Sequence, residues 1–142
     1  MRLFAATANT TLICCVLTVL SACTGAQPAG ERNLALSALV VDTHIDVPYR
    51  LYKKPADVAR ATADGDFDYP RALAGGLNAA FMSIYIPAAM DEAGEAYRFA
   101  EQMIDGVEAL ASRAPEQFAV ATCVADVERV LGSRQIALPM GM

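Results

Sequence analysis

The stretch ALVVDTHIDVP, residues 38–48, decides the fold of this chain. Its first part, from Ala38 to Asp42, is a short and continuous apolar run that contains two valines, which is typical of a strand buried on both faces in a parallel sheet. The run ends in Thr43-His44-Ile45-Asp46, and Pro48 stops the strand. The stretch therefore predicts a buried parallel strand with polar side chains at its carboxyl end.

Strand and helix patterns alternate through the rest of the chain. Residues 91–112 form the clearest helix pattern, because their apolar side chains recur every three or four residues at Tyr97, Ala100, Met103, Ile104, Val107, Leu110 and Ala111. Weaker patterns predict helical residues at 56–63, 71–74 and 124–131 and strands at 79–86, 118–122 and 136–140. This alternation predicts an α/β fold with parallel strands and right-handed crossovers. The pattern alone fits an open doubly wound sheet and part of a (β/α)₈ barrel equally well.

The amino-terminal segment differs in composition from the rest of the chain. All 16 acidic residues lie beyond residue 23, and Arg2 precedes an apolar run at residues 12–20 that is too short to span a bilayer. This pattern predicts an export signal over residues 1–22. Leu20-Ser21-Ala22-Cys23 resembles the bacterial lipobox, in which the cysteine is lipidated and becomes the new N-terminus. The alternative is a plain secretory signal with a chance cysteine at position 23.

Three segments follow from these boundaries. Residues 1–22 are the expected lipoprotein signal peptide, and residues 23–36 are an expected flexible tether, since Gly25, Pro28 and Gly30 lie among polar neighbours without periodicity. Residues 37–142 are the expected folded domain. The net charge of −5, with acidic and basic residues interspersed, offers no basic stripe for phosphates and argues against a nucleic-acid partner.

The remaining cysteine and an acidic cluster have simple interpretations. Cys14 and Cys15 lie in the leader and Cys23 would carry lipid, so Cys123 has no partner for an internal disulfide. We expect Cys123 to be a small buried apolar residue between a strand and a helix. The cluster at residues 64–68, DGDFD, lacks the glutamate at the twelfth position of a calcium loop, so it predicts a solvated loop.

His44 and Asp46 are the candidate metal ligands. Residues two apart on an extended strand project to the same side, so the imidazole and the carboxylate can converge on one point. In barrel enzymes the active site lies at the carboxyl end of the strands. A nitrogen and an oxygen ligand together suit Zn²⁺ or a similar divalent ion, which activates water and polarises a carbonyl. A structural histidine paired with a nearby carboxylate is the competing interpretation.

A longer set of residues adds a family resemblance. The segment at residues 42–49, DTHIDVPY, resembles the opening D-x-H-x-D-x-P-aromatic segment of membrane dipeptidases. The resemblance continues in the family's order through DYPR at 68–71, Gly75-Gly76, the strand pattern at 81–87 and EQM at 101–103. It covers nearly all of residues 38–142, and so long an ordered set of matches is improbable by chance.

This resemblance implies a fold and an activity. The fold is the N-terminal part of a (β/α)₈ TIM-type barrel of the amidohydrolase kind, which in this family holds two Zn²⁺ ions and a bridging glutamate from a later strand. The residues that match His44 and Asp46 bind the first zinc. The expected activity is that of a metallopeptidase, a hydrolase in which a hydroxide between the metals attacks the peptide carbonyl of a dipeptide, often one with a D-residue at its C-terminus. The export signal and the lipobox, for their part, predict a location in the bacterial cell envelope, with a lipid anchor on Cys23.

Two alternatives to a complete dipeptidase stay open. His44 is the only histidine in the sequence, so the family's remaining ligands are expected beyond Met142, with the glutamate immediately or almost immediately after it. This chain alone is then expected to be inactive, and a catalytically silent lipid-anchored lipoprotein is the first alternative, because two ligands leave a zinc site under-coordinated. Another amidohydrolase-type metal hydrolase, acting on lactams or esters, is the second, and the ordered matches after residue 68 weigh against it.

Overall fold

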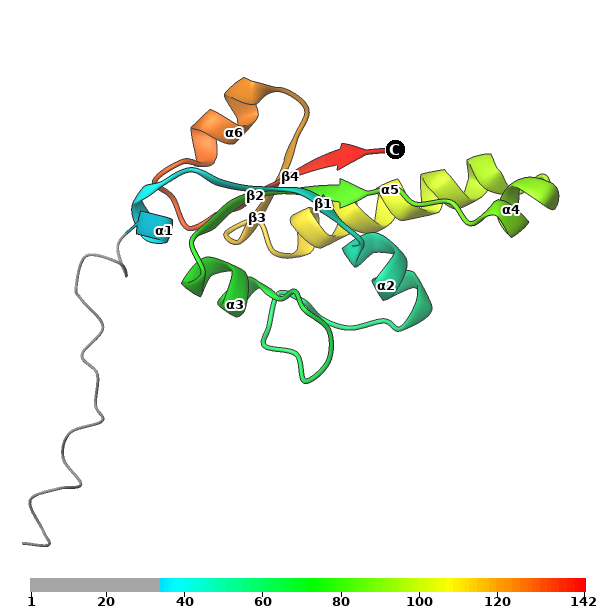
Figure 1. Cartoon of the computed structure of the whole chain (residues 1–142), viewed down its shortest axis with the longest axis horizontal. Helices are drawn as coiled ribbons and strands as arrows, with labels where there is room; N and C mark the ends of the chain where they lie inside the picture. Colours follow the sequence, from blue (N-terminus) through cyan, green and yellow to red (C-terminus); the bar gives the residue numbers. More distant parts are fainter. Residues whose placement is uncertain (1–33) are drawn as a thin grey trace, which may run out of the picture. The chain divides into compact units, whose positions relative to one another are not determined.

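The computed structural model describes residues 34–142 (Figure 1), and the expected signal peptide, Cys23 and most of the expected tether lie outside these residues. The helices are α1 (Leu34–Ser37), α2 (Val47–Lys53), α3 (Tyr69–Ala74), α4 (Ala88–Glu92), α5 (Ala96–Arg113) and α6 (Val124–Val130). The strands are β1 (Val40–Ile45), β2 (Leu77–Ser83), β3 (Phe118–Ala121) and β4 (Ile136–Gly141). Helices and strands therefore alternate, as the sequence pattern predicts.

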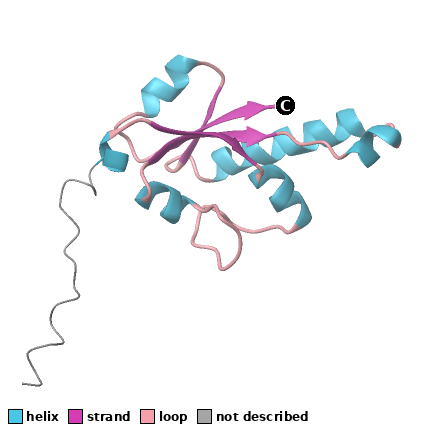
Figure 2. Cartoon of the chain, viewed as in Figure 1, coloured by secondary structure: helices cyan, strands magenta, loops and turns pink. Residues whose placement is uncertain are grey.

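All four strands are parallel and lie in one sheet, in the order β1-β2-β4-β3. Figure 2 shows the strand arrows pointing toward the same edge. The chain crosses the sheet in one direction from β1 to β3 and then turns back to β4. Because crossovers are right-handed, helices on the outward path cover one face and the helix on the return path covers the other. Accordingly α2, α3 and α5 lie on one side of the sheet and α6 lies on the opposite side (Figure 1).

Alternating side chains along the strands build a different core on each face. The face toward α2, α3 and α5 carries the larger residues, which include Met82 of β2, Phe118 of β3 and Leu138 of β4. The face toward α6 is built from alanines, which are Ala79, Ala119, Ala121 and Ala137, together with Val127 and Val130 of the helix. Short side chains let the helix backbone approach the sheet closely. The strands thus have the near-continuous apolar character of a parallel sheet covered on both sides.

The helix predicted over residues 91–112 is two helices, which corrects the sequence interpretation. Gly94 adopts a positive φ of 70° between α4 and α5. That backbone conformation is open to glycine at little cost and breaks the helical hydrogen-bond ladder. The amphipathic face of α5 is otherwise as predicted, with Phe99, Ala100, Met103, Val107 and Leu110 buried.

Three further predictions need correction. The segment at 56–63 is not helical, because Tyr69 donates its backbone N–H to the carbonyl of Val58 and Thr62 donates its own to Asp68. The strands predicted at 38–42 and 79–86 are shifted to 40–45 and 77–83. Cys123 is exposed instead of buried, since it is the N-cap residue of α6 at the surface.

Asp68 is fully buried, although the sequence pattern suggested a solvated loop at residues 64–68. It is the N-cap residue of α3 and accepts hydrogen bonds from the backbone N–H groups of Thr62 at 2.9 Å and Arg71 at 3.0 Å. The Arg71 guanidinium adds a contact of 2.9 Å from Nε. These bonds, led by the one from the Thr62 backbone, lower the pKa of Asp68 from 3.8 to about 2. The carboxylate therefore ties the long loop before α3 to the start of that helix.

A pH dependence follows from this depressed pKa. A carboxyl group with a lower pKa in the folded state stabilises the fold fully above its unfolded pKa of 3.8, and this contribution is lost as the pH falls toward 2. We expect Asp68→Asn to lower the unfolding temperature near pH 7 and to flatten its decline between pH 4 and pH 2, as measured by circular dichroism. Asp66→Asn is the control, because Asp66 is exposed and makes no side-chain hydrogen bond within residues 34–142. Equal acid profiles for Asp68→Asn and the unmodified protein would contradict this assignment.

Candidate metal site at the carboxyl edge of the sheet

A bulge in β1 sets the direction of the His44 side chain. Asp42 pairs with Ala80 and Ile45 pairs with Met82, so Thr43 and His44 lie opposite the single residue Phe81 of β2. The Asp42 carboxylate accepts a hydrogen bond of 3.0 Å from the backbone N–H of His44 and supports the bulge. Bulges of this kind re-aim a side chain. Here Ile45 packs against the larger core, whereas the His44 side chain is exposed.

His44 and Asp46 meet at the carboxyl end of β1. His44 Nε2 lies 3.2 Å from Asp46 Oδ1, and the two side chains are 68% and 63% exposed. The sequence pattern anticipates this meeting, but the geometry that produces it is different. Only His44 belongs to the strand, which ends at Ile45, and Asp46 is the N-cap residue of α2 with φ −85° and ψ 30°. Its carboxylate makes no cap hydrogen bond and is free to face the imidazole.

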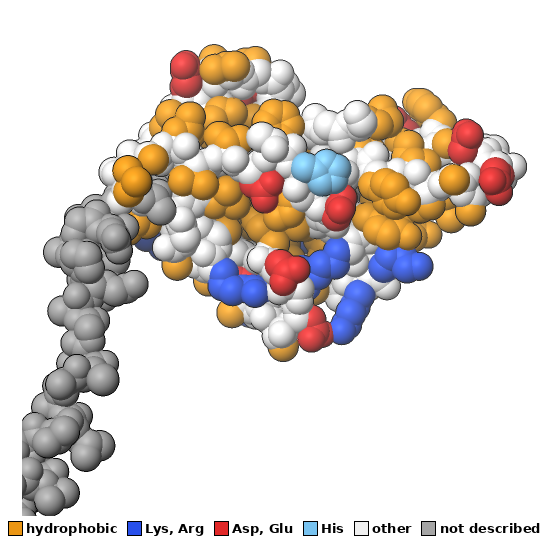
Figure 3. Space-filling view, viewed as in Figure 1, with side chains coloured by type: hydrophobic (Ala, Val, Ile, Leu, Met, Phe, Trp, Pro, Cys, Tyr) orange, Lys and Arg blue, Asp and Glu red, His pale blue; other side chains and the backbone are white. Residues whose placement is uncertain are grey.

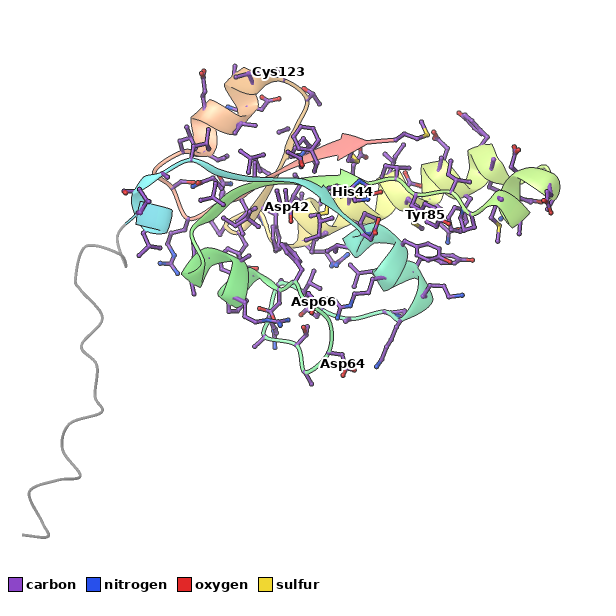
Figure 4. The ribbon with its side chains drawn as sticks, in the orientation of Figure 1. Asp42, His44, Asp64, Asp66, Tyr85 and Cys123 are labelled. Atoms are coloured by element: carbon purple, nitrogen blue, oxygen red, sulfur yellow. The ribbon has the colours of Figure 1, made fainter. Side chains whose placement is uncertain are left out.

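The segment after Asp46 is firmly anchored. Val47 and Pro48 begin α2 and are both buried, and proline is well suited to the first turn of a helix because its missing N–H needs no partner there. The strand ends at Ile45, ahead of Pro48, which lies in the first turn of the helix that follows. Figure 4 labels His44 near the end of β1 and Tyr85 in the segment that follows β2. Figure 3 shows the pale blue His44 side chain at the surface, with acidic side chains on either side of it.

An aromatic cluster lies at the same edge of the sheet. Tyr49 of α2 contacts Tyr85 edge to face at 5.1 Å between ring centroids, and Tyr52 contacts Phe99 of α5 in the same way at 4.8 Å. These pairs connect α2, α5 and the segment after β2. They hold the helix that starts at Asp46 in a fixed position relative to the strand that carries His44.

The donor chemistry fits part of a metal site. One imidazole nitrogen and one carboxylate oxygen point into the same solvent-accessible space, and this combination suits Zn²⁺. Within residues 34–142 no group of three or more histidine, cysteine, aspartate or glutamate side chains is gathered closely enough to hold a metal ion. These residues can therefore contribute two ligands, and a closed site needs further donors.

The comparison with known families decides what kind of protein this is. The model of the membrane dipeptidase family, peptidase family M19, matches residues 29–142. The chain belongs to this family. The M19 match confirms the resemblance seen in the ordered motifs, and a metal cofactor goes with the family. The search of curated proteins found no match.

Two solved structures support the M19 fold. The metallopeptidase dipeptidase AC of family M19 is 24% identical and has a TM-score of 0.60, with 72% of this chain and 34% of that chain covered. A metallopeptidase from Rhodobacter sphaeroides, liganded with a phosphinate mimic of the dipeptide L-Ala-D-Ala, is 23% identical and has a TM-score of 0.60, with 72% and 37% covered. The chain thus spans about a third of the length of each. The predicted fold class, part of a (β/α)₈ barrel, is confirmed.

Three of the four strands follow the order of consecutive strands in a barrel. Strands β1, β2 and β4 lie side by side in chain order, as consecutive strands of a barrel do, and β3 pairs on the far side of β4.

Within the described part of the chain, no helix is long and apolar enough to cross a membrane.

Proposed function

We propose that this M19 chain provides the first part of a zinc-dependent dipeptidase site, with His44 and Asp46 as ligands of one of two zinc ions. The observation that carries the proposal is the contact of 3.2 Å between His44 Nε2 and Asp46 Oδ1 at the carboxyl edge of a parallel sheet. The substrate class we propose is a dipeptide, including one with a D-residue at its C-terminus. It is supported by the phosphinate mimic of L-Ala-D-Ala bound by the Rhodobacter sphaeroides metallopeptidase.

Each residue of the site has a distinct part in this proposal. His44 offers Nε2 to the ion, and its backbone N–H is held by Asp42, so the bulge fixes the direction of the ring. Asp46 offers a carboxylate oxygen and carries negative charge that offsets the charge of the metal. The chemistry that the bound ions supply is activation of water and polarisation of the scissile carbonyl. The exposure of both side chains leaves them accessible to ions and substrate.

The two ligands His44 and Asp46 do not complete a catalytic zinc site. Zinc in a catalytic site takes three protein ligands and an open position. Residues 34–142 by themselves are therefore proposed to bind metal weakly and to lack dipeptidase activity. Further ligands are proposed to come from outside these residues. A silent lipoprotein is the competing function, and the lack of a three-ligand cluster in residues 34–142 is the observation that favours it.

Hydrolysis by the full-length gene product, expressed from its native locus, tests the proposal. We expect release of alanine from L-Ala-D-Ala, loss of this activity after removal of metal with a chelator, and recovery on addition of Zn²⁺. An N-acetylated dipeptide of the same composition is the control substrate, because it lacks the free amino group that defines a dipeptide. If the metal-loaded gene product leaves all dipeptides intact, the silent lipoprotein replaces the enzyme.

The lipid anchor is a separate proposal that rests on the sequence Leu20-Ser21-Ala22-Cys23. Acyl chains contribute about 0.8 kcal/mol for each buried CH₂, so two or more chains hold a protein firmly at a membrane. We expect the unmodified protein to sediment with membranes and Cys23→Ser to be released into the soluble fraction of the envelope or the medium. Cys15→Ser is the matched control and is expected to leave the protein at the membrane. A soluble unmodified protein would contradict the anchor.

A further inference from the structure

The backbone around His44 departs from the regular strand ladder. Asp42 pairs with Ala80 and Ile45 pairs with Met82, so one extra residue of β1 lies between these two pairs. A bulge leaves its extra residue outside the ladder, and a backbone N–H that is left out needs another partner. The Asp42 side chain is that partner, since its Oδ1 accepts a hydrogen bond of 3.0 Å from the N–H of His44. The carboxylate of Asp42 therefore stabilises the bulge from within β1.

The side chains of the two proposed ligands have little other support. His44 Nε2 lies 3.2 Å from Asp46 Oδ1, and this is the only side-chain hydrogen bond of either residue within residues 34–142. Both side chains are more than 60% exposed, so little packing restricts them. Asp46 continues directly into α2, where Arg50 donates its backbone N–H to the carbonyl of Asp46 at 3.0 Å. The direction in which the imidazole leaves the strand thus depends on the backbone at His44.

The hydrogen bond between Asp42 and His44 joins residues two apart and has a narrow geometric requirement. Aspartate and asparagine side chains readily accept a hydrogen bond from the backbone N–H two residues further on, because their length closes this small ring. Glutamate carries the same charge as aspartate but is one methylene longer, so it does not close the same ring. The contact therefore depends on the length of the side chain and on an acceptor oxygen, and not on the negative charge.

We infer that Asp42 is a positioning residue for the proposed ligand His44. In this inference, which rests on the proposed function, Asp42 holds the backbone of the bulge and thereby the direction in which the imidazole offers Nε2 to the ion. Support that orients a metal ligand strengthens metal binding, and its loss typically weakens affinity by about 10–100-fold. In this role Asp42 touches neither the ion nor the substrate, and its length and acceptor oxygen matter more than its charge.

Zn²⁺ affinity of the full-length gene product, measured by competition with a chromogenic chelator, tests the inference with three changes at one position. We expect Asp42→Ala to weaken binding by about 10–100-fold, because it removes the acceptor. Asp42→Glu keeps the charge but not the length, and it is expected to weaken binding over the same range of about 10–100-fold. Asp42→Asn keeps the length and the acceptor. Its affinity should stay within about fivefold of the unmodified protein, since a charge near solvent acts weakly on an ion that it does not touch.

Hydrogen exchange of the metal-free protein gives a second measurement that does not depend on Zn²⁺. The backbone amide of His44 should exchange about fivefold faster in Asp42→Ala and Asp42→Glu than in Asp42→Asn, which is the effect of one ordinary hydrogen bond. The amide of Met82, a fully buried residue of β2, is the internal reference and should exchange at the same rate in all variants. Asp66→Ala is the control protein, because Asp66 is exposed and makes no side-chain hydrogen bond within residues 34–142.

Three results would overturn the inference. The first is equal Zn²⁺ affinity for Asp42→Ala and the unmodified protein. The second is an affinity that Asp42→Glu keeps and Asp42→Asn loses, which would assign the effect to charge. The third is faster exchange at Met82 as well as at His44, which would assign it to a general loss of structure. The proposed function fails in a different way, since then the unmodified protein binds no Zn²⁺ at this site and His44→Ala has no effect, while the His44 amide still distinguishes the Asp42 variants.

Discussion

His44→Ala and Asp46→Asn are each expected to abolish most of the proposed dipeptidase activity of the full-length gene product. Each change removes one of the two donors that meet at 3.2 Å, and Asn keeps the size of the carboxylate while it removes the charge. Removal of a residue that only supports a metal ligand costs about 10–100-fold in affinity or activity, so loss of a ligand itself should cost at least the upper end of that range. The measurements are kcat/KM for L-Ala-D-Ala and zinc content by elemental analysis.

Stability measurements separate this effect from misfolding. Both side chains are more than 60% exposed, so the metal-free variants should unfold at nearly the same temperature as the unmodified metal-free protein. Glu108→Ala is the control, because Glu108 is an exposed carboxylate on α5 that makes no side-chain hydrogen bond within the described residues. Full activity with a normal zinc content in either His44→Ala or Asp46→Asn would remove that residue from the metal site.

Phe118→Ala is expected to produce the largest loss of stability. The Phe118 side chain is 2% exposed and lies between Tyr69, at 5.6 Å edge to face, and Phe67, at 6.3 Å between ring centroids. It therefore joins β3 to the loop and helix that precede β2. Truncation of a buried phenylalanine to alanine costs about 3–5 kcal/mol, because it removes apolar burial and leaves a cavity. The free energy of unfolding typically falls by about 1–3 kcal/mol for each mole per litre of urea, so the urea midpoint of unfolding should fall by roughly 2 M.

An exposed aromatic residue gives the matched control for this measurement. Tyr97 on α5 is 79% exposed, so Tyr97→Ala should change the urea midpoint only slightly. The slope of the urea transition should be the same for both variants and the unmodified protein. If Phe118→Ala unfolds at the same urea concentration as Tyr97→Ala, the loop that carries Phe67 is not packed on β3 as described.

The sequence by itself determined the class of fold and indicated the residues at the centre of the proposed site. The apolar run before His44 and the alternation that follows specify parallel strands with helical crossovers, because burial on both faces requires continuous apolar strands. The pair His44 and Asp46 is likewise local, since the two residues are two apart in the sequence, although Asp46 meets the imidazole from the N-cap position of α2 and not from the strand. The sequence also carries a signal for the N-cap role of Asp68, because an aspartate followed by Tyr69-Pro70 is typical of a helix start.

Only the tertiary structure decided how these elements meet. The position of β3 beyond β4 and the bulge opposite Phe81 both depend on pairing between strands that are far apart in the sequence. The burial of Asp68 and the exposure of Cys123 also reverse what their local neighbours suggest. The physical reason is that strand register and burial are set by hydrogen-bond and packing partners from distant segments. Local periodicity records which face of an element is apolar, but it carries no information on which segment will cover that face.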